Sequence, residues 1–156
     1  MMTLGTTLEW QILAEVAVAM LLGGVIGLER EIASKPAGFR THMLVAGSAA
    51  LMVGMAFALV ERGAGSAWSD DVAADPIRIL QALTIGVSFL GAGTIFRRRP
   101  SGDIHGLTTA ASLLMSSGIG VAVALRHFVL AIGITVLVAV ALRVLERVEE
   151  HIHRKT

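Results

Sequence analysis

The sequence predicts an all-α polytopic membrane protein with five transmembrane helices. Five apolar stretches lie between Ile12 and Leu142, and nearly every charge falls in the connections between them. A helix rising about 1.5 Å per residue needs roughly 20 apolar residues to cross a hydrocarbon core about 30 Å thick, and these stretches come close to that length. The composition agrees, because 54% of the residues are hydrophobic and the mean hydropathy is +0.74. Barrel strands alternate apolar and polar residues, whereas Leu44 to Val60 is apolar or small throughout.

The five predicted spans follow one another through short connections. They are Ile12–Leu28, Met43–Val60, Ile79–Phe96, Gly106–Leu125 and His127–Leu142. The first is a retained helix rather than a secretory signal, because the residues before it include Glu9 and no Lys or Arg. The third begins at Asp75-Pro76, where Asp caps the helix and Pro occupies its first position. Gly91 and Gly93 favour the end of that helix, with a re-entrant or kinked segment as the alternative.

The chain ends in a short amphipathic segment. The fifth span is short enough to need snorkelling by Arg126 and Arg143, and beyond Leu142 apolar residues are spaced along a charged helix. We therefore divide the chain into a transmembrane domain, residues 1–142, and a cytoplasmic tail, residues 143–156.

The positions of lysine and arginine predict the orientation of the bundle. One side carries Arg30, Lys35, Arg40, Arg97, Arg98, Arg99, Arg143, Arg147, Arg154 and Lys155. The other side carries only Arg62, Arg78 and Arg126. This bias predicts an external N-terminus and a cytoplasmic C-terminus.

Small residues recur at helix-contact spacing and let helices approach closely. The candidate packing glycines are Gly23, Gly27, Gly86, Gly91 and Gly93. Packing inside one bundle is the favoured interpretation, and a homo-oligomer interface is the alternative. As partners we expect membrane lipid and further copies of the chain, and no nucleic acid.

One internal similarity links two connections. GFRT, residues 38–41, precedes the second span as GLTT, residues 106–109, precedes the fourth. Both first helices of these hairpins run in the same direction, so the pattern suggests a parallel tandem repeat, although four matched positions also arise by chance.

Five motifs carry a family resemblance. They are GGVIGLERE (Gly23 to Glu31), KPAGFRTHMLVA (Lys35 to Ala46), DPIRILQ (Asp75 to Gln81), FLGAGTI (Phe89 to Ile95) and HGLTTAAS (His105 to Ser112). In this order and spacing they resemble the membrane domain of the MgtC/SapB family. The resemblance covers about residues 10 to 142. Many members carry a further cytoplasmic domain after the fifth span, which we expect to be absent here, and some virulence-associated members have Asn where this chain has Thr108.

The resemblance implies a multi-pass protein of the bacterial inner membrane, associated with growth under low magnesium and with virulence. Members are often labelled magnesium transporters. The family resemblance instead implies a membrane regulator, with the proton-translocating ATP synthase as a target of the name-giving type.

Polar residues of these motifs gather at two places. We expect a cytoplasmic polar cluster made of Glu29, Arg30, Arg40, Thr41, His42, Arg97, Thr108 and Thr109. It is either a docking surface for a partner or an anion, or a set of interfacial ion pairs and helix caps. At the outer end, the third helix carries Asp75, Arg78 and Gln81.

The sequence predicts no cofactor, no metal centre and no enzyme. No paired deep carboxylates or placed nucleophile with a His base are recognisable. The outer acidic residues Glu61, Asp70, Asp71 and Asp75 leave direct magnesium binding open, but a solvated acidic loop is the ordinary interpretation. The tail residues Glu150, His151 and His153 are likewise better explained as an exposed charged helix than as a metal site.

Two functions from different classes remain. The first is a regulator or adaptor that binds another inner-membrane complex. The second is a transporter or channel for magnesium or another small ion, which would require an oligomer. Charged residues near mid-membrane mark ion pathways, and the middle of every predicted span is uncharged, with Glu15 and Gln81 near the outer boundary. We therefore expect the regulator.

Overall fold

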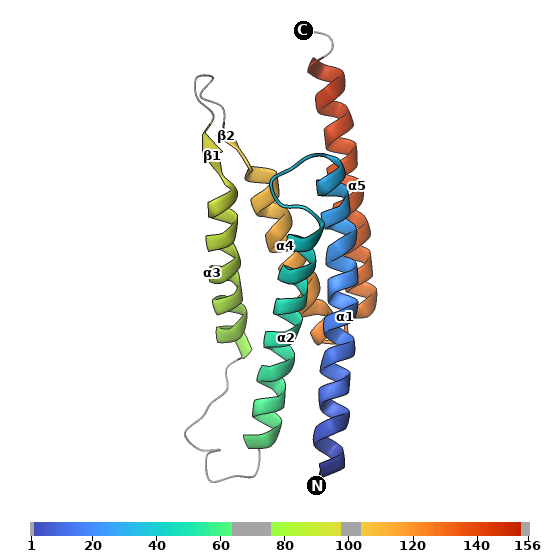
Figure 1. Ribbon diagram of the computed structural model, residues 1–156, viewed down its shortest axis with the longest axis vertical. Helices are drawn as coiled ribbons and strands as arrows, with labels where there is room; N and C mark the ends of the chain where they lie inside the picture. Colours follow the sequence, from blue (N-terminus) through green and yellow to red (C-terminus); the bar gives the residue numbers. More distant parts are fainter. Residues whose placement is uncertain (1, 64–75, 98–103, 154–156) are drawn as a thin grey trace.

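The computed structural model is a bundle of five helices (Figure 1). It describes residues 2–63, 76–97 and 104–153, with the side chains of 6–60, 77–95, 104–144 and 147. The elements are α1 (Met2–Ile32), α2 (Phe39–Gly63), α3 (Pro76–Thr94), β1 (Phe96–Arg97), β2 (Ile104–His105), α4 (Leu107–Ala124) and α5 (Phe128–His153). The only strands among the described residues are β1 and β2, a two-residue antiparallel ladder that pairs Phe96 with His105.

The all-α polytopic membrane fold predicted from the sequence is confirmed. Four helices are long and apolar enough to cross a membrane: Thr6–Ile32, Phe39–Val60, Ile77–Thr94 and Leu107–Ala124. The fifth, Phe128–Val144, is a shorter apolar helix. This agrees with the prediction that the fifth span is short. α3 begins at Pro76, as the Asp-Pro signal predicted. α5 continues through Leu142 without a break and includes most of the charged tail.

The connections rich in basic residues share one end of the bundle. Figure 1 shows the α1–α2 connection, the β1–β2 ladder and the end of α5 at the same end of the bundle, and the start of α1 at the other. We call the end of the bundle that holds the α1–α2 connection the basic end, because Lys35, Arg40 and Arg97 belong to it. The arrangement is the one that the predicted orientation requires, and a cytoplasmic location of the basic end stays a prediction.

The tightest part of the fold is the packing of α1, α2 and α4. A Cβ atom added to Gly23 would lie 2.6 Å from the His42 carbonyl oxygen, and one added to Gly120 would lie 2.1 Å from the Ala46 carbonyl oxygen. Small residues at these positions therefore bring backbones into direct contact, which is how helices associate in lipid. The central apolar cluster includes Ala19, Ile26, Ala46 and Ile119, and α5 adds Ala131 and Leu142 to it.

α3 lies at the periphery. It packs chiefly against α4, where a Cβ added to Gly91 would lie 3.2 Å from Ala110 Cβ. Its remaining surface is open: Ile85 is 71% exposed and Phe89 is 79% exposed. A Cβ added to Gly86 or Gly93 would meet nothing within 4 Å, so neither glycine lies against another helix within the described residues. A homo-oligomer interface at these two positions stays a prediction.

Candidate functional site

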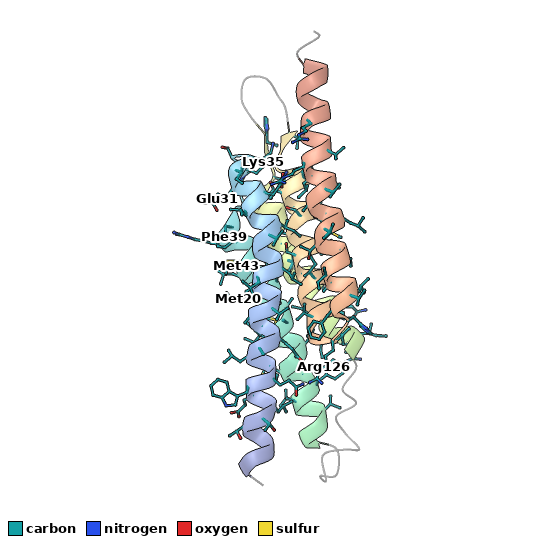
Figure 2. All side chains as sticks on the ribbon, turned by 90° about the vertical axis from the view of Figure 1, so that its right-hand side faces the viewer. Met20, Glu31, Lys35, Phe39, Met43 and Arg126 are labelled. Carbon is teal, nitrogen blue, oxygen red and sulfur yellow. The ribbon has the colours of Figure 1, made fainter. Side chains whose placement is uncertain are left out.

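The polar residues at the basic end are brought together by close helix packing. Gly27 of α1 lets the start of α2 approach, since a Cβ there would lie 2.7 Å from Phe39 Cα. The Glu31 carboxylate then reaches across, and its Oε2 accepts a hydrogen bond of 2.8 Å from the Phe39 backbone N–H (Figure 2). This contact satisfies one of the unpaired N–H groups at the start of α2 and fixes the entry of that helix beside the end of α1.

Glu29 and Arg30 form a buried ion pair at the end of α1. Arg30 Nε donates to Glu29 Oε2 at 2.6 Å, and Arg30 Nη2 donates to Glu29 Oε1 at 2.8 Å. The two side chains are 6% and 2% exposed. Buried charges are tolerated when they are paired in this two-pronged geometry, so the pair places no net charge in the bundle.

His42 links α2 to α4 and is fully buried. Its Nδ1 lies 2.9 Å from the Gly38 carbonyl oxygen and its Nε2 lies 3.0 Å from Ser112 Oγ. Ser112 Oγ donates to the Thr109 carbonyl oxygen at 2.9 Å.

The protonation state of the His42 ring determines whether the Ser112 hydroxyl donates its hydrogen to the Thr109 carbonyl or to His42 Nε2. The Gly38 carbonyl oxygen only accepts, so Nδ1 must carry a hydrogen. Ser112 has a single hydroxyl hydrogen. If it is donated to Thr109, Nε2 must also carry a hydrogen, and the ring is then an imidazolium. In the neutral ring the Ser112 hydroxyl turns to donate to Nε2 and leaves the Thr109 carbonyl.

The structure divides the predicted cytoplasmic cluster into two sets. Glu29, Arg30, His42 and Thr109 are buried; with Ser112 we call them the buried polar cluster. Arg40, Thr41 and Thr108 are exposed at the same end. The side chains of Arg97 and Asp75 lie outside the described residues, as do the outer acidic residues and the metal candidates of the tail.

One contributor was not anticipated from the sequence. Ser112 was quoted only as the end of the HGLTTAAS motif, although it lies three residues after Thr109 on the same helical face, which was the available signal. His42 was expected in the polar cluster, and the tight crossing of α1, α2 and α4 encloses its ring completely.

A second ion pair lies at the opposite end. Arg126, in the turn between α4 and α5 with a left-handed φ of 61°, donates from Nε to Glu15 Oε1 at 3.1 Å (Figure 2). Gln11 donates to the same oxygen at 3.4 Å. Glu15, which the sequence placed near the outer boundary, is buried, while Gln81 and Arg78 are exposed on α3.

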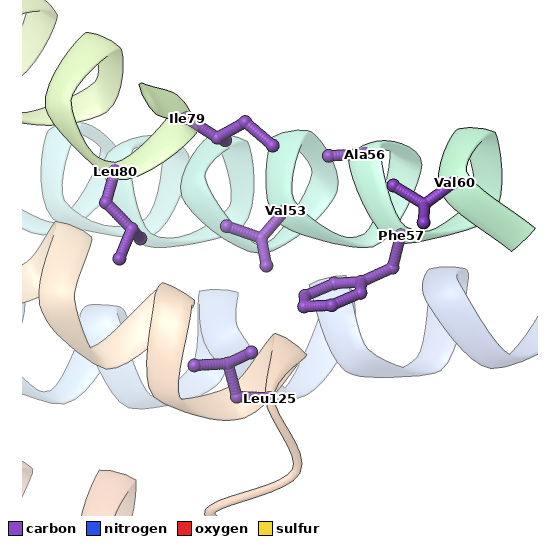
Figure 3. Close-up of a pocket in the computed structure, with 7 residues that line it drawn as sticks. All are labelled: Val53, Ala56, Phe57, Val60, Ile79, Leu80 and Leu125. Atoms are coloured by element: carbon purple, nitrogen blue, oxygen red, sulfur yellow. The ribbon is translucent and has the colours of Figure 1, made fainter. Parts of the chain in front are cut away.

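The seam between α2 and α3 contains an apolar cavity near this opposite end. It has a volume of about 90 Å³ and is lined by Val53, Ala56, Phe57, Val60, Ile79, Leu80 and Leu125 (Figure 3). None of these side chains offers a polar atom. Within the described residues, no group of three or more His, Asp or Glu side chains is arranged to hold a metal ion.

The arrangement therefore pairs its buried carboxylates with arginines, and the charged side chains that it exposes among the described residues lie towards its ends. Between the buried polar cluster and the Glu15–Arg126 pair, the side chains that α1, α2 and α4 bury are apolar, apart from the hydroxyls of Ser116 and Ser117 in the described part of the chain. Ser116 Oγ has no hydrogen-bond partner there.

Comparison with known proteins identifies the family. The model of the MgtC family matches residues 16–151. Protein MgtC of Salmonella typhimurium is 36% identical over 136 residues, which are 87% of this chain and 53% of that protein. Protein SapB of Bacillus subtilis is 36% identical over 124 residues, 78% of this chain and 50% of SapB.

A third relative carries a functional name. "Putative magnesium transporter YhiD" of Escherichia coli is 36% identical over 129 residues, 81% of this chain and 57% of that protein. The chain thus spans little more than half the length of these curated relatives. No solved structure matches it. The extent of the family match and the identity to these relatives show that this protein belongs to the MgtC family.

Proposed function

We propose that this protein is a non-enzymatic regulator or adaptor of the bacterial inner membrane that acts by binding another membrane complex under magnesium limitation. Membership of the MgtC family supports the link to magnesium and to a bacterial membrane. The observation that carries the choice of regulator over transporter is the closed packing of α1, α2 and α4. Direct backbone contacts at Gly23 and Gly120 leave no room for a solvated path along the axis of these three helices.

The charges support the same choice. Glu29 is neutralised by Arg30, and Glu15 is paired with Arg126. A cation crossing lipid needs polar or acidic groups along its route, and each of these two carboxylates is engaged by an arginine near one end of the bundle. Carboxylates paired in this way suit a rigid scaffold that presents its exposed ends.

The exposed residues of the basic end form the proposed docking surface. Arg40, Thr41 and Thr108 lie there around the buried polar cluster, which holds the start of α2 and α4 in place. An inner-membrane complex with a cytoplasmic acidic or polar face would meet these side chains. The resemblance to the family makes the proton-translocating ATP synthase the first candidate.

The test is co-purification of the tagged full chain from bacteria grown with little magnesium. The proposal predicts that a membrane complex is retained by the natural sequence and lost with Thr108→Glu, a substitution that a helix N-terminus tolerates. Arg143→Ala is the control, because Arg143 is exposed on α5 rather than at the start of α2 or α4. Retention of the complex by Thr108→Glu and Arg40→Ala, or its loss with Arg143→Ala, contradicts the proposal.

A second candidate is a magnesium transporter or channel. The name of the YhiD relative favours it. Because the three-helix core is closed, this function requires an oligomer in which several copies enclose a path, with the exposed face of α3 as the available contact surface.

A further inference from the structure

A groove runs along the basic half of the seam between α2 and α3. It extends from Arg40 and Thr41 to Met52 on α2, and from Leu90 to Ala82 on α3, with a volume of about 520 Å³. That volume is within the range of small-molecule sites, roughly 300–1,000 Å³. Twelve residues of helix rise about 18 Å, which is close to one leaflet of a hydrocarbon core about 30 Å thick.

The groove ends near the middle of the bundle. There Ala49, Val53 and Leu83 form a buried contact between α2 and α3. The separate cavity of Figure 3 occupies the same seam beyond this contact. The groove is therefore one leaflet deep and has its polar mouth at the basic end.

The walls and the mouth of the groove differ in chemistry. The walls are almost entirely apolar and include Leu44, Val87 and Gly86, where an added Cβ would meet nothing. The mouth carries the exposed guanidinium of Arg40 and the hydroxyl of Thr41. An apolar slot of leaflet depth below a cation is complementary to one kind of molecule, a lipid with a negative headgroup.

An acyl chain suits the depth and the walls of the groove. The groove spans about 18 Å of helix rise, close to the length of a chain that crosses one leaflet, and its lining offers the apolar contact that a hydrocarbon chain needs. A helix of a second copy is the other occupant, and the filling experiment below distinguishes it.

We propose that this groove binds one acyl chain of an anionic glycerophospholipid, with the phosphate held at its mouth by Arg40 and Thr41. The lipid fills the space that α2 and α3 leave between them and so attaches α3 to the rest of the bundle. The site selects its ligand by charge at the mouth and by an apolar chain in the groove.

The headgroup is tested by native mass spectrometry of the full chain in detergent, with phosphatidylglycerol and phosphatidylcholine of identical acyl chains. Both lipids carry the phosphate, but the choline cation of phosphatidylcholine offsets its charge beside Arg40, so we expect about tenfold tighter binding of phosphatidylglycerol. Arg40→Gln should abolish this preference, while Arg143→Gln, at an exposed arginine of α5 outside the groove, should preserve it. Equal binding of the two lipids by the natural sequence, or equal losses with both variants, overturns the proposal.

The groove itself is tested by filling it. Gly86→Leu places a side chain in the slot and should weaken binding of both lipids by about tenfold or more, because the removed contact is worth several buried methylenes. Gly133→Leu is the matched control, since Gly133 also faces open space but lies on α5. Unchanged lipid binding by Gly86→Leu overturns the proposal. So does a loss of self-association with Gly86→Leu at unchanged lipid binding, which would assign the face to a second copy.

Discussion

The helices α1 and α3, which precede the two similar motifs GFRT and GLTT, are held in opposite ways. α1 contacts the backbone of α2 through Gly23 and Gly27 and ends in a buried ion pair. α3 touches α4 near Gly91 and leaves Gly86 open beside a groove. Lipid tails are as apolar as the side chains, so helices in a membrane are held by close packing and polar contacts rather than by burial alone. α1 has both kinds of contact, and α3 has little of either against α2.

The difference extends to the motifs themselves. In GFRT the glycine carbonyl of residue 38 accepts from His42, four residues later, which in turn reaches Ser112. In GLTT the glycine carbonyl of residue 106 has Ala110 at the equivalent position. The first hairpin therefore carries a side-chain link to its neighbours that the second cannot make through this residue.

The largest effect is expected from breaking the buried pair at the end of α1. Glu29→Gln leaves Arg30 without its counter-charge, and such a loss costs about 3–5 kcal/mol of folding free energy. Replacing both residues with Leu and Met should recover most of it. Unfolding by sodium dodecyl sulfate, followed by circular dichroism, measures both. A Glu29→Gln variant as stable as the natural chain would contradict the role given to the pair.

A smaller effect is expected from adding a methyl group at the glycines of the two regions. Gly120→Ala places Cβ against the Ala46 carbonyl and should lower stability by about 1–3 kcal/mol. Gly86→Ala meets nothing and should be neutral or slightly stabilising, because alanine favours helix by up to about 1 kcal/mol. The same detergent titration compares them. Equal losses would remove the distinction between a closed core and a peripheral α3.

The link from α2 to α4 is tested by two serines one turn apart on α4. Ser112→Ala removes the partner of His42 and should cost about 1 kcal/mol. Ser116→Ala removes a buried hydroxyl that has no partner in the described part of the chain, so it should cost nothing or stabilise. If thermal unfolding of the two purified variants gave the reverse order, the assigned hydrogen-bond chain would be incorrect.

The smallest effect is expected at the ion pair of the opposite end. Arg126 is about half exposed, and exposed pairs contribute about 0.2–1 kcal/mol. A double-mutant cycle with Glu15→Gln and Arg126→Gln should give a coupling in that range that shrinks as salt is added. A salt-independent coupling free energy well above this range would contradict the expectation that the Glu15–Arg126 pair stabilises the fold less than the Glu29–Arg30 pair.

Much of the fold was predictable because lipid imposes length and composition on each span. The five helices, the start of α3 at Pro76 and the shortness of the fifth span all followed from local sequence. What local sequence did not show is which face of each helix meets which neighbour. Gly27 and Gly86 have the same small-residue signature, yet only Gly27 contacts another helix.

The candidate site was predicted only in part, because local sequence does not show which residues of different helices meet. The motifs predicted a common polar cluster that includes Glu29, Arg30, His42 and Thr109, and the structure buries these four side chains. Their burial, the recruitment of Ser112 and the pairing of Glu15 with Arg126 depend on contacts between residues 70 and 111 positions apart. Periodicity along one helix carries no information about such partners.

Magnesium flux into liposomes that contain the purified full chain tests the closed core most directly. The account predicts uptake no faster than in liposomes without protein, for the natural chain and for Glu15→Gln alike. Gradient-driven uptake by the natural chain that Glu15→Gln or Gln81→Ala abolishes would contradict the account, and would make the protein a conduit rather than an adaptor.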